Sequence, residues 1–138
     1  MLGISYASKN TSNIDLAILG DLSFFHDMNG LHFLINNKIN TKFLILNNNG
    51  GQIFSKLDIS KFDIPNFEKF WITPLNIDLK NIALLYGVDY LEPKDLDDLL
   101  LMINKKNDKP LIIDYKIDIN ISAERKEKLV ESINKIIN

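Results

Sequence analysis

The chain has 138 residues, about the length of one domain, and 46% of them are hydrophobic, enough for a small core. A formal net charge of −2 argues against a general nucleic-acid-binding protein, because that role needs a basic surface. The lack of cysteine excludes disulfides, thiolate catalysis and cysteine-ligated zinc. No apolar run reaches the roughly 18 residues of a membrane span, and the first residues do not read as a signal peptide. We therefore expect a cytoplasmic protein with no membrane span.

The first half of the chain predicts a strand, a helix and a second strand. Residues 14–19 form a short apolar run that ends at Gly20 and Asp21, and residues 43–46 form another that ends in the polar run 47–51. Between the two runs, residues with a helical period follow one another: Met28, Leu31, His32, Leu34 and Ile35. Strand, helix and strand within this length predict a βαβ unit with a right-handed crossover.

The second half continues the alternation after an irregular, aromatic-rich segment at residues 52–75. A short helix is expected over 79–86, stopped by Gly87, and a strand over 88–91. Pro93 suits the first turn of the next helix, whose apolar stripe is Leu96, Leu99, Leu100 and Ile103.

A further strand is predicted over residues 110–115. Ser122 is then the expected N-cap of a last helix, with Leu129, Ile133 and Ile137 on its inner face. The whole pattern predicts the α/β class, with a mostly parallel sheet and helices on both faces.

Two polar clusters follow the first two strands, where α/β sheets bind ligands. The first is Gly20-Asp21-Leu22-Ser23 and the second is Asn47-Asn48-Asn49-Gly50-Gly51. One carboxylate with amide and carbonyl oxygens would suit Mg²⁺ and leave positions for phosphate oxygens. Taken singly, each cluster also reads as a simple turn. Asp21 and Asn48 lie 27 positions apart in one βαβ unit, and this spacing lets both reach the same crevice.

This pair resembles the cofactor-binding motif of thiamine-diphosphate enzymes, which opens with Gly-Asp and closes with Asn-Asn. The resemblance implies that Asp21, Asn48 and the carbonyl of Gly50 bind Mg²⁺ or Mn²⁺, which in turn holds the diphosphate. Gly20, Leu22 and Ser23 would line that diphosphate. Leu22 departs from the glycine that many members have there, which points to a subfamily.

Three ordered stretches indicate the subfamily: residues 20–31, 47–55 and 67–74 look like the 2-succinyl-5-enolpyruvyl-6-hydroxy-3-cyclohexene-1-carboxylate (SEPHCHC) synthases. That resemblance implies decarboxylation of 2-oxoglutarate on thiamine diphosphate and transfer of the succinyl unit to isochorismate, in menaquinone biosynthesis. Ile53 would then lie near the cofactor, and Phe54 and Leu57 near the substrate.

The resemblance also implies that another domain supplies part of the active site. The glutamate that activates the cofactor belongs to a pyrimidine-binding domain, usually of another subunit, so no catalytic residue is assigned here. Residues 1–138 are expected to be one diphosphate- and Mg²⁺-binding domain, truncated at its amino end, inactive alone and part of a homo-oligomer.

Alternative functions stay open at this point. One is another thiamine-diphosphate enzyme, such as a 2-oxo-acid decarboxylase or acetolactate synthase. Another is a non-catalytic orphan domain that needs a partner chain. A Rossmann domain is disfavoured because no Gly-x-Gly-x-x-Gly follows either strand.

Other chemistry-bearing side chains favour structural roles. We expect His32 to be structural and His26 to pack near the site, and we expect Trp71 to cover core or an interface. Three carboxylates near a helix start suit the helix dipole on a solvated face: Asp95, Asp97 and Asp98.

Overall fold

A four-stranded parallel sheet organises the chain, in a computed structural model that describes residues 2–8 and 15–137. The strand order is β1-β2-β4-β3, and all three neighbouring pairs are parallel. The strands are β1 (Asp15–Gly20), β2 (Thr41–Asn47), β3 (Asp89–Leu91) and β4 (Leu111–Lys116). All four were predicted; Ile14, expected to begin the first, lies outside the described residues.

The central strands β2 and β4 are buried on both faces, which explains their unbroken apolar sequence. Residues 41–45 of β2 and 111–114 of β4 are all buried. In register, Phe43 lies beside Ile112 and Ile45 beside Asp114. Asp114 is therefore a carboxylate inside the sheet.

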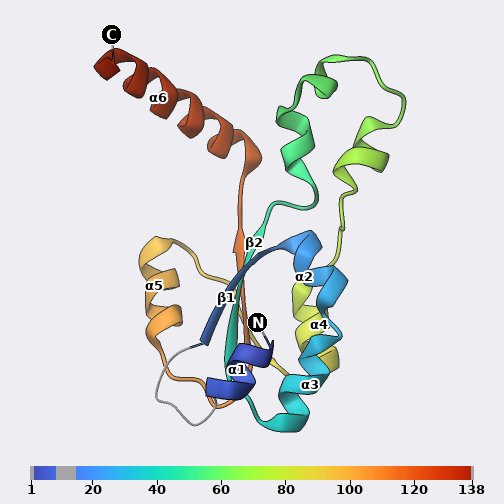
Figure 1. Cartoon of the computed structure of the whole chain (residues 1–138), viewed down its shortest axis with the longest axis vertical. Helices are drawn as coiled ribbons and strands as arrows, with labels where there is room; N and C mark the ends of the chain where they lie inside the picture. Colours follow the sequence, from blue (N-terminus) through green and yellow to red (C-terminus); the bar gives the residue numbers. More distant parts are fainter. Residues whose placement is uncertain (1, 9–14, 138) are drawn as a thin grey trace.

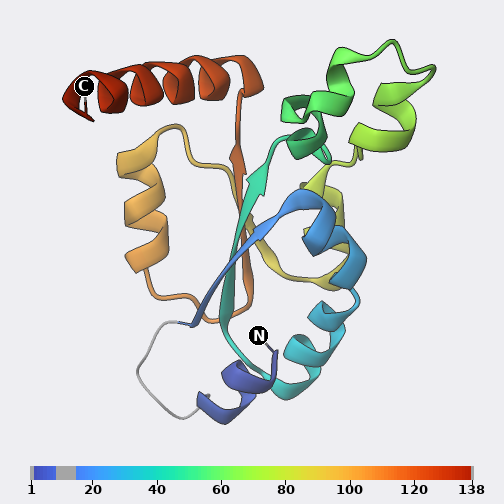
Figure 2. The same ribbon diagram turned by 45° about the horizontal axis from the view of Figure 1, so that its top comes forward.

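Helices cover both faces of the sheet, as predicted (Figures 1 and 2). One face carries α2 (Asp21–Asp27), α3 (Gly30–Asn37) and α4 (Leu79–Tyr86), and the short α1 (Leu2–Ser8) packs on α3 through the Tyr6 and Phe33 rings, 5.9 Å apart. The other face carries α5 (Leu96–Asn104). The larger core lies under the first group of helices and is formed by Ala17, Phe24, Leu31, Leu34, Ile39, Phe43, Ile45, Leu79, Ile82, Ala83, Val88 and Ile112. The smaller one, under α5, is formed by Leu44, Leu99, Leu111 and Ile113.

Side-chain caps set the boundaries of α4 and α5. The predicted helix over 79–86 is confirmed: Asp78 caps it by accepting from Lys80 N at 2.9 Å, and Gly87 ends it with φ +68°. Helix α5 starts later than the position of Pro93 suggested, because Asp95 is its N-cap and accepts from Asp98 N at 2.8 Å. Of the predicted stripe, Leu99 is buried, Ile103 is partly buried, and Leu96 and Leu100 are exposed.

The last helix, α6 (Ile119–Ile137), differs from the prediction in two respects. Its N-cap is Asp118, whose Oδ1 accepts from Asn120 N at 2.8 Å and Ile121 N at 3.2 Å, and Ser122 lies inside the helix. Its expected inner face is exposed, because no described element packs on Leu129, Ile133 or Ile137. Among the described helices, none is both long enough and apolar enough to cross a bilayer.

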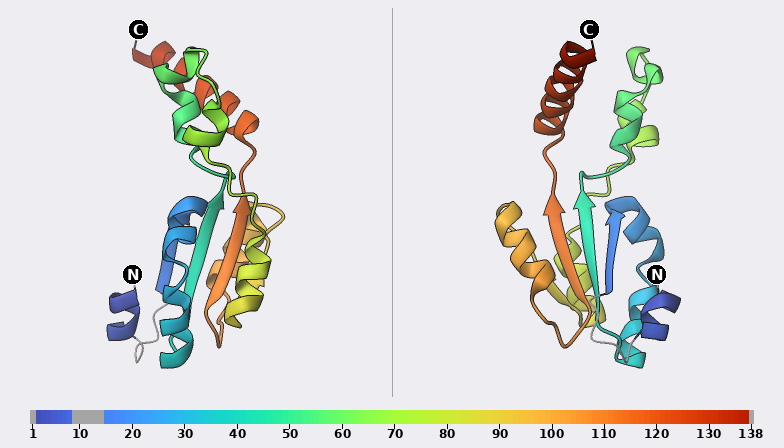
Figure 3. Two further views of the ribbon diagram at one scale, coloured as in Figure 1. Left: turned by 90° about the vertical axis from the view of Figure 1, so that its right-hand side faces the viewer. Right: turned by 60° about the vertical axis from the view of Figure 1, so that its left-hand side comes forward.

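The aromatic segment between β2 and α4, residues 50–75, forms an arm of single helical turns. These are η1 (Gln52–Lys56), η2 (Asp58–Lys61) and the π-turn η3 (Glu68–Ile72). The arm and α6 both extend beyond the carboxyl ends of β2 and β4 (Figure 3). That end of the sheet is where the two polar clusters lie.

Candidate functional site

The two polar clusters meet at the carboxyl ends of β1 and β2. These strands pair in parallel, with Gly20 beside Leu46, so both chains leave the sheet at the same edge. Asp21 follows β1 directly and is 3% exposed. The backbone N–H of Gly50 donates to Asp21 Oδ2 at 2.7 Å, across 29 positions of sequence. The structure therefore brings Asp21 together with the turn that contains Asn48.

Both carboxylate oxygens of Asp21 already accept one backbone hydrogen bond. Leu22 N donates to Oδ1 at 2.8 Å, and Gly50 N donates to Oδ2. A carboxylate offers about four lone-pair sites, so each oxygen can still bind a cation. These two bonds hold the carboxylate in one orientation beside the turn.

Gly50 occupies a position that no other residue fits. Its φ is +120°, and an added Cβ would lie 2.5 Å from Ile72 O and 3.1 Å from Thr73 O. Its carbonyl accepts from Gln52 N at 2.9 Å, which leaves a second lone pair. The backbone at Gly50 is thus close to the arm on one side and to Asp21 on the other.

Asn48 has a side chain with no hydrogen bond to any residue that the structure describes. It is partly buried and lines an open hollow at the ends of β2 and β4. The hollow is polar and is lined by Asn47, Asn48, Asn49, Asn76, Ile77, Lys116, Ile117, Asp118, Ile119 and Asn120. The Asn48 amide has no protein partner among the described residues and opens onto this hollow, so it is available to bind a ligand.

This donor set fits a hard divalent cation. Within residues 2–8 and 15–137, no group of three or more histidine, aspartate or glutamate side chains could hold a metal ion by itself. A cation here would rely on one carboxylate, one amide oxygen and one backbone carbonyl, and would keep positions for water or phosphate oxygens.

Two asparagines fasten the base of the arm. Asn49 Nδ2 donates to Asn76 Oδ1 at 3.0 Å, and Asn76 N donates to Asn49 Oδ1 at 2.9 Å. Gly51 N also donates to Ile72 O at 2.7 Å. Both asparagines have positive φ, which their residue type tolerates. The sequence analysis assigned no role to Asn76, and nothing in its local pattern marks it.

The predicted cofactor- and substrate-contacting residues of the arm lie on η1 and just after it. Ile53 and Leu57 are 67% and 46% exposed. Phe54 is partly buried, and its ring meets the Trp71 ring edge-on, with centroids 5.5 Å apart. Trp71 also stacks on Phe67 at 6.0 Å. It was expected to cover core or an interface, and it belongs to neither described core cluster; its ring contacts lie within the arm.

The predicted diphosphate-lining residues lie where β1 turns into α2. Gly20 ends the strand and is exposed, Leu22 is partly buried and Ser23 is exposed. Taken singly, this cluster also read as a simple turn. In the structure the helix α2 begins at Asp21 itself, and Leu22 N donates to the Asp21 carboxylate.

The two histidines lie outside this cluster. His32 is exposed on α3, with Nε2 2.9 Å from Asn36 Nδ2. His26 is exposed on α2, where it lines a separate hollow with Phe24 and Phe43. Neither ring contacts Asp21 or Asn48, so neither is placed for acid–base chemistry there.

A second polar network, which the sequence analysis missed, lies at the ends of β2, β3 and β4. Asp114, 2% exposed, accepts from Asn47 Nδ2 at 3.0 Å and from the Tyr90 hydroxyl at 3.0 Å. Glu92 Oε2 lies 3.2 Å from the same hydroxyl, and Glu92 Oε1 accepts from Lys116 at 2.8 Å. A charged residue inside the apolar run 111–115 was the available signal.

Electrostatics in this network follow from its contacts. Burial, followed by the hydrogen bond to Asp114, raises the pKa of Tyr90 above its ordinary value, so the hydroxyl stays protonated. The hydrogen bond from Lys116 lowers the pKa of Glu92, and the same bond raises the pKa of Lys116. The network therefore combines a Tyr90 hydroxyl that keeps its proton with the ion pair of Lys116 and Glu92.

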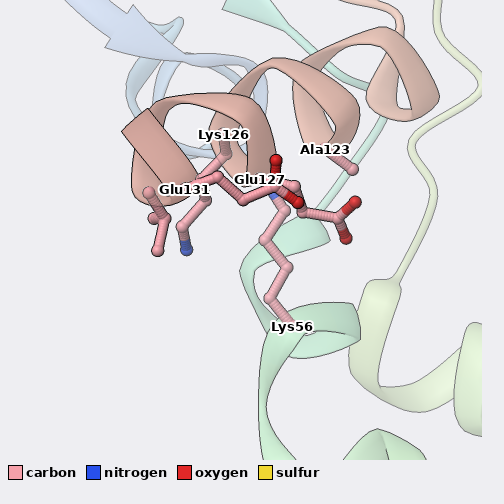
Figure 4. A pocket seen from close by; sticks show the side chains of 6 residues that line it. Lys56, Ala123, Lys126, Glu127 and Glu131 are labelled. Carbon is pink, nitrogen blue, oxygen red and sulfur yellow. The ribbon is translucent and has the colours of Figure 1, made fainter. Parts of the chain in front are cut away.

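Another hollow separates η1 from α6. Lys56 reaches from η1 toward α6, whose Ala123, Lys126, Glu127 and Glu131 line the other side together with Val130 (Figure 4). This hollow has mixed charge and none of the predicted site residues. It shows that the arm and α6 face each other beyond the sheet.

Comparison with known proteins places the chain in a family. Residues 1–115 match the family described as thiamine pyrophosphate enzyme, C-terminal TPP binding domain. The chain therefore belongs to the thiamine-diphosphate enzymes, through their C-terminal cofactor-binding domain.

Curated relatives carry one particular enzyme name. The chain is 34% identical over 130 residues to the SEPHCHC synthase of Leuconostoc citreum, which covers 94% of this chain and 23% of that protein. It is 44% identical over 91 residues to the SEPHCHC synthase of Microcystis aeruginosa, covering 64% and 15%. The chain thus spans less than a quarter of the length of these relatives.

A solved structure supports the fold. Benzoylformate decarboxylase from Polynucleobacter necessarius superposes with a TM-score of 0.69 at 17% identity, covering 84% of this chain and 22% of that one. At this identity the likeness shows the fold alone. It agrees with the predicted thiamine-diphosphate-binding fold.

Proposed function

We propose that residues 1–138 act as the diphosphate- and metal-binding domain of a SEPHCHC synthase, and that the complete enzyme transfers a succinyl unit from 2-oxoglutarate to isochorismate. The observation that carries the proposal is the 2.7 Å hydrogen bond from Gly50 N to Asp21, which joins the two halves of the cofactor motif. The names of the relatives favour this enzyme over other members of the family.

In this proposal, three groups hold Mg²⁺ or Mn²⁺: a carboxylate oxygen of Asp21, the amide oxygen of Asn48 and the carbonyl of Gly50. The carbonyl of Gly50 keeps a free lone pair, and the Asn48 side chain has no competing partner among the described residues. The metal would neutralise the diphosphate and fix it at the end of β1, where Gly20, Leu22 and Ser23 would line it.

When bound, thiamine diphosphate supplies the carbon nucleophile and the electron sink for decarboxylation of a 2-oxo acid. The residues of this chain would bind and orient it and keep water away from it. Ile53 would face the cofactor, and Phe54 and Leu57 the substrate, on an arm that Asn49 and Asn76 fasten at its base. The exposed side chains of Ile53 and Leu57 support this role, because they offer an apolar wall to a bound group.

The activating glutamate would come from a pyrimidine-binding domain, in a cytoplasmic homo-oligomer. The exposed apolar side chains on α6 and the arm support an assembled state, because so much apolar surface is usually covered in a working protein.

Product analysis tests this proposal. The chain is mixed with the pyrimidine-binding part of the enzyme from the same source, thiamine diphosphate and Mg²⁺. Consumption of 2-oxoglutarate and isochorismate, with CO₂ release, is expected from the mixture, and no turnover from the chain alone. Turnover of pyruvate in place of 2-oxoglutarate would assign another enzyme of the family, and turnover by the chain alone would contradict the need for a second domain.

A further inference from the structure

Asp114 is a carboxylate buried in the middle of the sheet. It lies in β4 after Ile113, which is fully buried, and is itself 2% exposed. A buried charge is unfavourable unless hydrogen bonds compensate for its lost hydration. Its partners therefore indicate why a carboxylate is present here.

One of its partners belongs to the turn at the candidate cofactor site. Asn47 Nδ2 donates to Asp114 Oδ1 at 3.0 Å. Both Asp114 oxygens accept hydrogen bonds, Oδ1 from Asn47 and Oδ2 from the Tyr90 hydroxyl, so Asp114 determines which end of the Asn47 amide faces it. The amide oxygen of Asn47 then points the other way and accepts from Asn49 N at 3.2 Å.

The oriented amide of Asn47 supports the conformation of the turn that follows. Asn49 has φ +59° and Gly50 has φ +120°, so this backbone is held in sparsely populated conformations. Gly50 N then meets the Asp21 carboxylate. The hydrogen bonds thus run from Asp114 through Asn47 to the turn that presents Asn48 and Gly50.

We propose that Asp114 is a positioning residue for the metal- and diphosphate-binding turn, acting through the side-chain amide of Asn47. The inference rests on the proposed function, because it concerns the same site. Asp114 is not one of the proposed ligands; its contact with Asn47 would set the geometry of the turn that carries them. Supporting residues of this kind change metal affinity by about 10- to 100-fold when they are replaced.

The other oxygen of Asp114 supplies a matched control. The Tyr90 hydroxyl donates to Oδ2, and Glu92 lies within reach of the same hydroxyl. Tyr90→Phe removes this partner and leaves the contact to Asn47 intact. It therefore reports the effect of disturbing Asp114 without disturbing the turn.

Asp114→Asn and Asp114→Leu separate positioning from packing. In Asp114→Asn, the new amide oxygen can accept from Asn47, and the new NH₂ can donate to the Tyr90 oxygen while that hydroxyl turns to Glu92. The orientation of Asn47 is then kept. Asp114→Leu has a similar size and offers Asn47 no acceptor, so the amide of Asn47 is released.

The test uses the full chain and two readouts. The first is hydrogen exchange of the Asn49 and Gly50 amides without cofactor, measured by NMR. The second is the Mg²⁺ concentration for half-maximal binding of thiamine diphosphate, measured by calorimetry. Asp114→Leu is expected to speed exchange at both amides and to raise the Mg²⁺ midpoint by about 10-fold or more. Asp114→Asn and Tyr90→Phe should stay close to the unsubstituted chain.

Each outcome decides the proposal. Equal exchange and equal Mg²⁺ midpoints for Asp114→Leu and Tyr90→Phe would overturn it. No binding of thiamine diphosphate by the unsubstituted chain at any Mg²⁺ concentration would instead overturn the proposed function, and this inference with it. If Asp114→Leu does not fold, Asn47→Ala takes its place, and the same changes in exchange and in the Mg²⁺ midpoint are expected. Values for Asn47→Ala equal to those of Tyr90→Phe would overturn the inference.

Discussion

Gly50 shows how one residue joins the candidate site to the arm. Its N–H donates to Asp21 Oδ2 at 2.7 Å, and its carbonyl accepts from Gln52 N at 2.9 Å. The space that a Cβ would need is taken by the Ile72 and Thr73 carbonyls at the arm's base. A side chain here would have to push the arm away from the sheet.

Gly50→Ala is therefore expected to lower the free energy of unfolding by about 1–3 kcal/mol or more, through strain at positive φ and the clash with Ile72 O. Gly87→Ala is the matched control, because Gly87 also has positive φ, at +68°, but its Cβ would meet nothing within 4 Å. Chemical denaturation measures both. Equal losses in the two variants would show that the close approach to Ile72 has no energetic effect.

At the scale of residues, Asp21 and Asn48 were predicted as site residues because each follows a short apolar run that forms a strand. Parallel strands bring such residues to one edge whatever the rest of the fold does. Asp114 and Asn76 were missed for a physical reason. Their roles consist of hydrogen bonds to Asn47 and Asn49, 67 and 27 positions away, and no local period encodes such pairs.

At the scale of secondary-structure elements, the strands and the helix α4 form where the local sequence pattern predicted them. Helix α4 has both of its boundaries in the sequence, with Asp78 as its cap and Gly87 as its end. The last helix was predicted with the wrong cap and a buried face. An amphipathic period says which face of a helix is apolar but not what covers it, and no described element covers this face.

The arm depends on its fastened base. Asn76→Ala should remove the hydrogen bond from Asn49 Nδ2 to Asn76 Oδ1 and keep the one that the Asn76 backbone N–H donates to Asn49. It should lower the free energy of unfolding by about 1 kcal/mol and speed hydrogen exchange along residues 50–75. Asn66→Ala is a suitable control, because Asn66 also has positive φ, at +58°, and no side-chain hydrogen bond to a described residue. If the free energy of unfolding falls equally in both variants, the side-chain contact between Asn49 and Asn76 contributes nothing beyond the tolerance of asparagine for positive φ.

Strand β2 and helix α5 are joined by a buried lysine. Lys42 is fully buried and donates to the carbonyls of Met102, Ile103 and Lys105 at the end of α5, where a cation also suits the helix dipole. Burial lowers the pKa of Lys42 from 10.5. In the pH window just below 10.5, the unfolded chain therefore binds more protons than the folded chain.

Because of this difference, the contribution of Lys42 to the free energy of unfolding should rise with pH through that window, as Lys42 loses its proton in the folded state. Lys42→Met keeps the apolar stem and should remove this part of the rise. The measurement is denaturant unfolding at several pH values up to 10.5. Lys80→Met, on the exposed face of α4, should keep the slope, and an unchanged slope in Lys42→Met would contradict the account.

At the scale of the whole molecule, the sheet end, the arm and α6 surround one open region. Large apolar side chains are exposed along both projections, among them Ile53, Leu57, Phe62, Phe70, Leu129, Ile133 and Ile136. The α/β class and strand positions could be predicted because they depend on local periods. The direction of the arm and of α6 could not, since it depends on contacts between segments far apart in the chain.

The most direct test of the central claim is a calorimetric titration of the chain with thiamine diphosphate, with and without Mg²⁺, alongside Asp21→Ala. The account predicts saturable binding that requires both Mg²⁺ and Asp21, because Asp21 is the charged member of the proposed set of metal ligands. Circular dichroism of both chains confirms that each is folded. Binding that is unchanged without Mg²⁺ or in folded Asp21→Ala, or no binding by the folded unsubstituted chain, would contradict it.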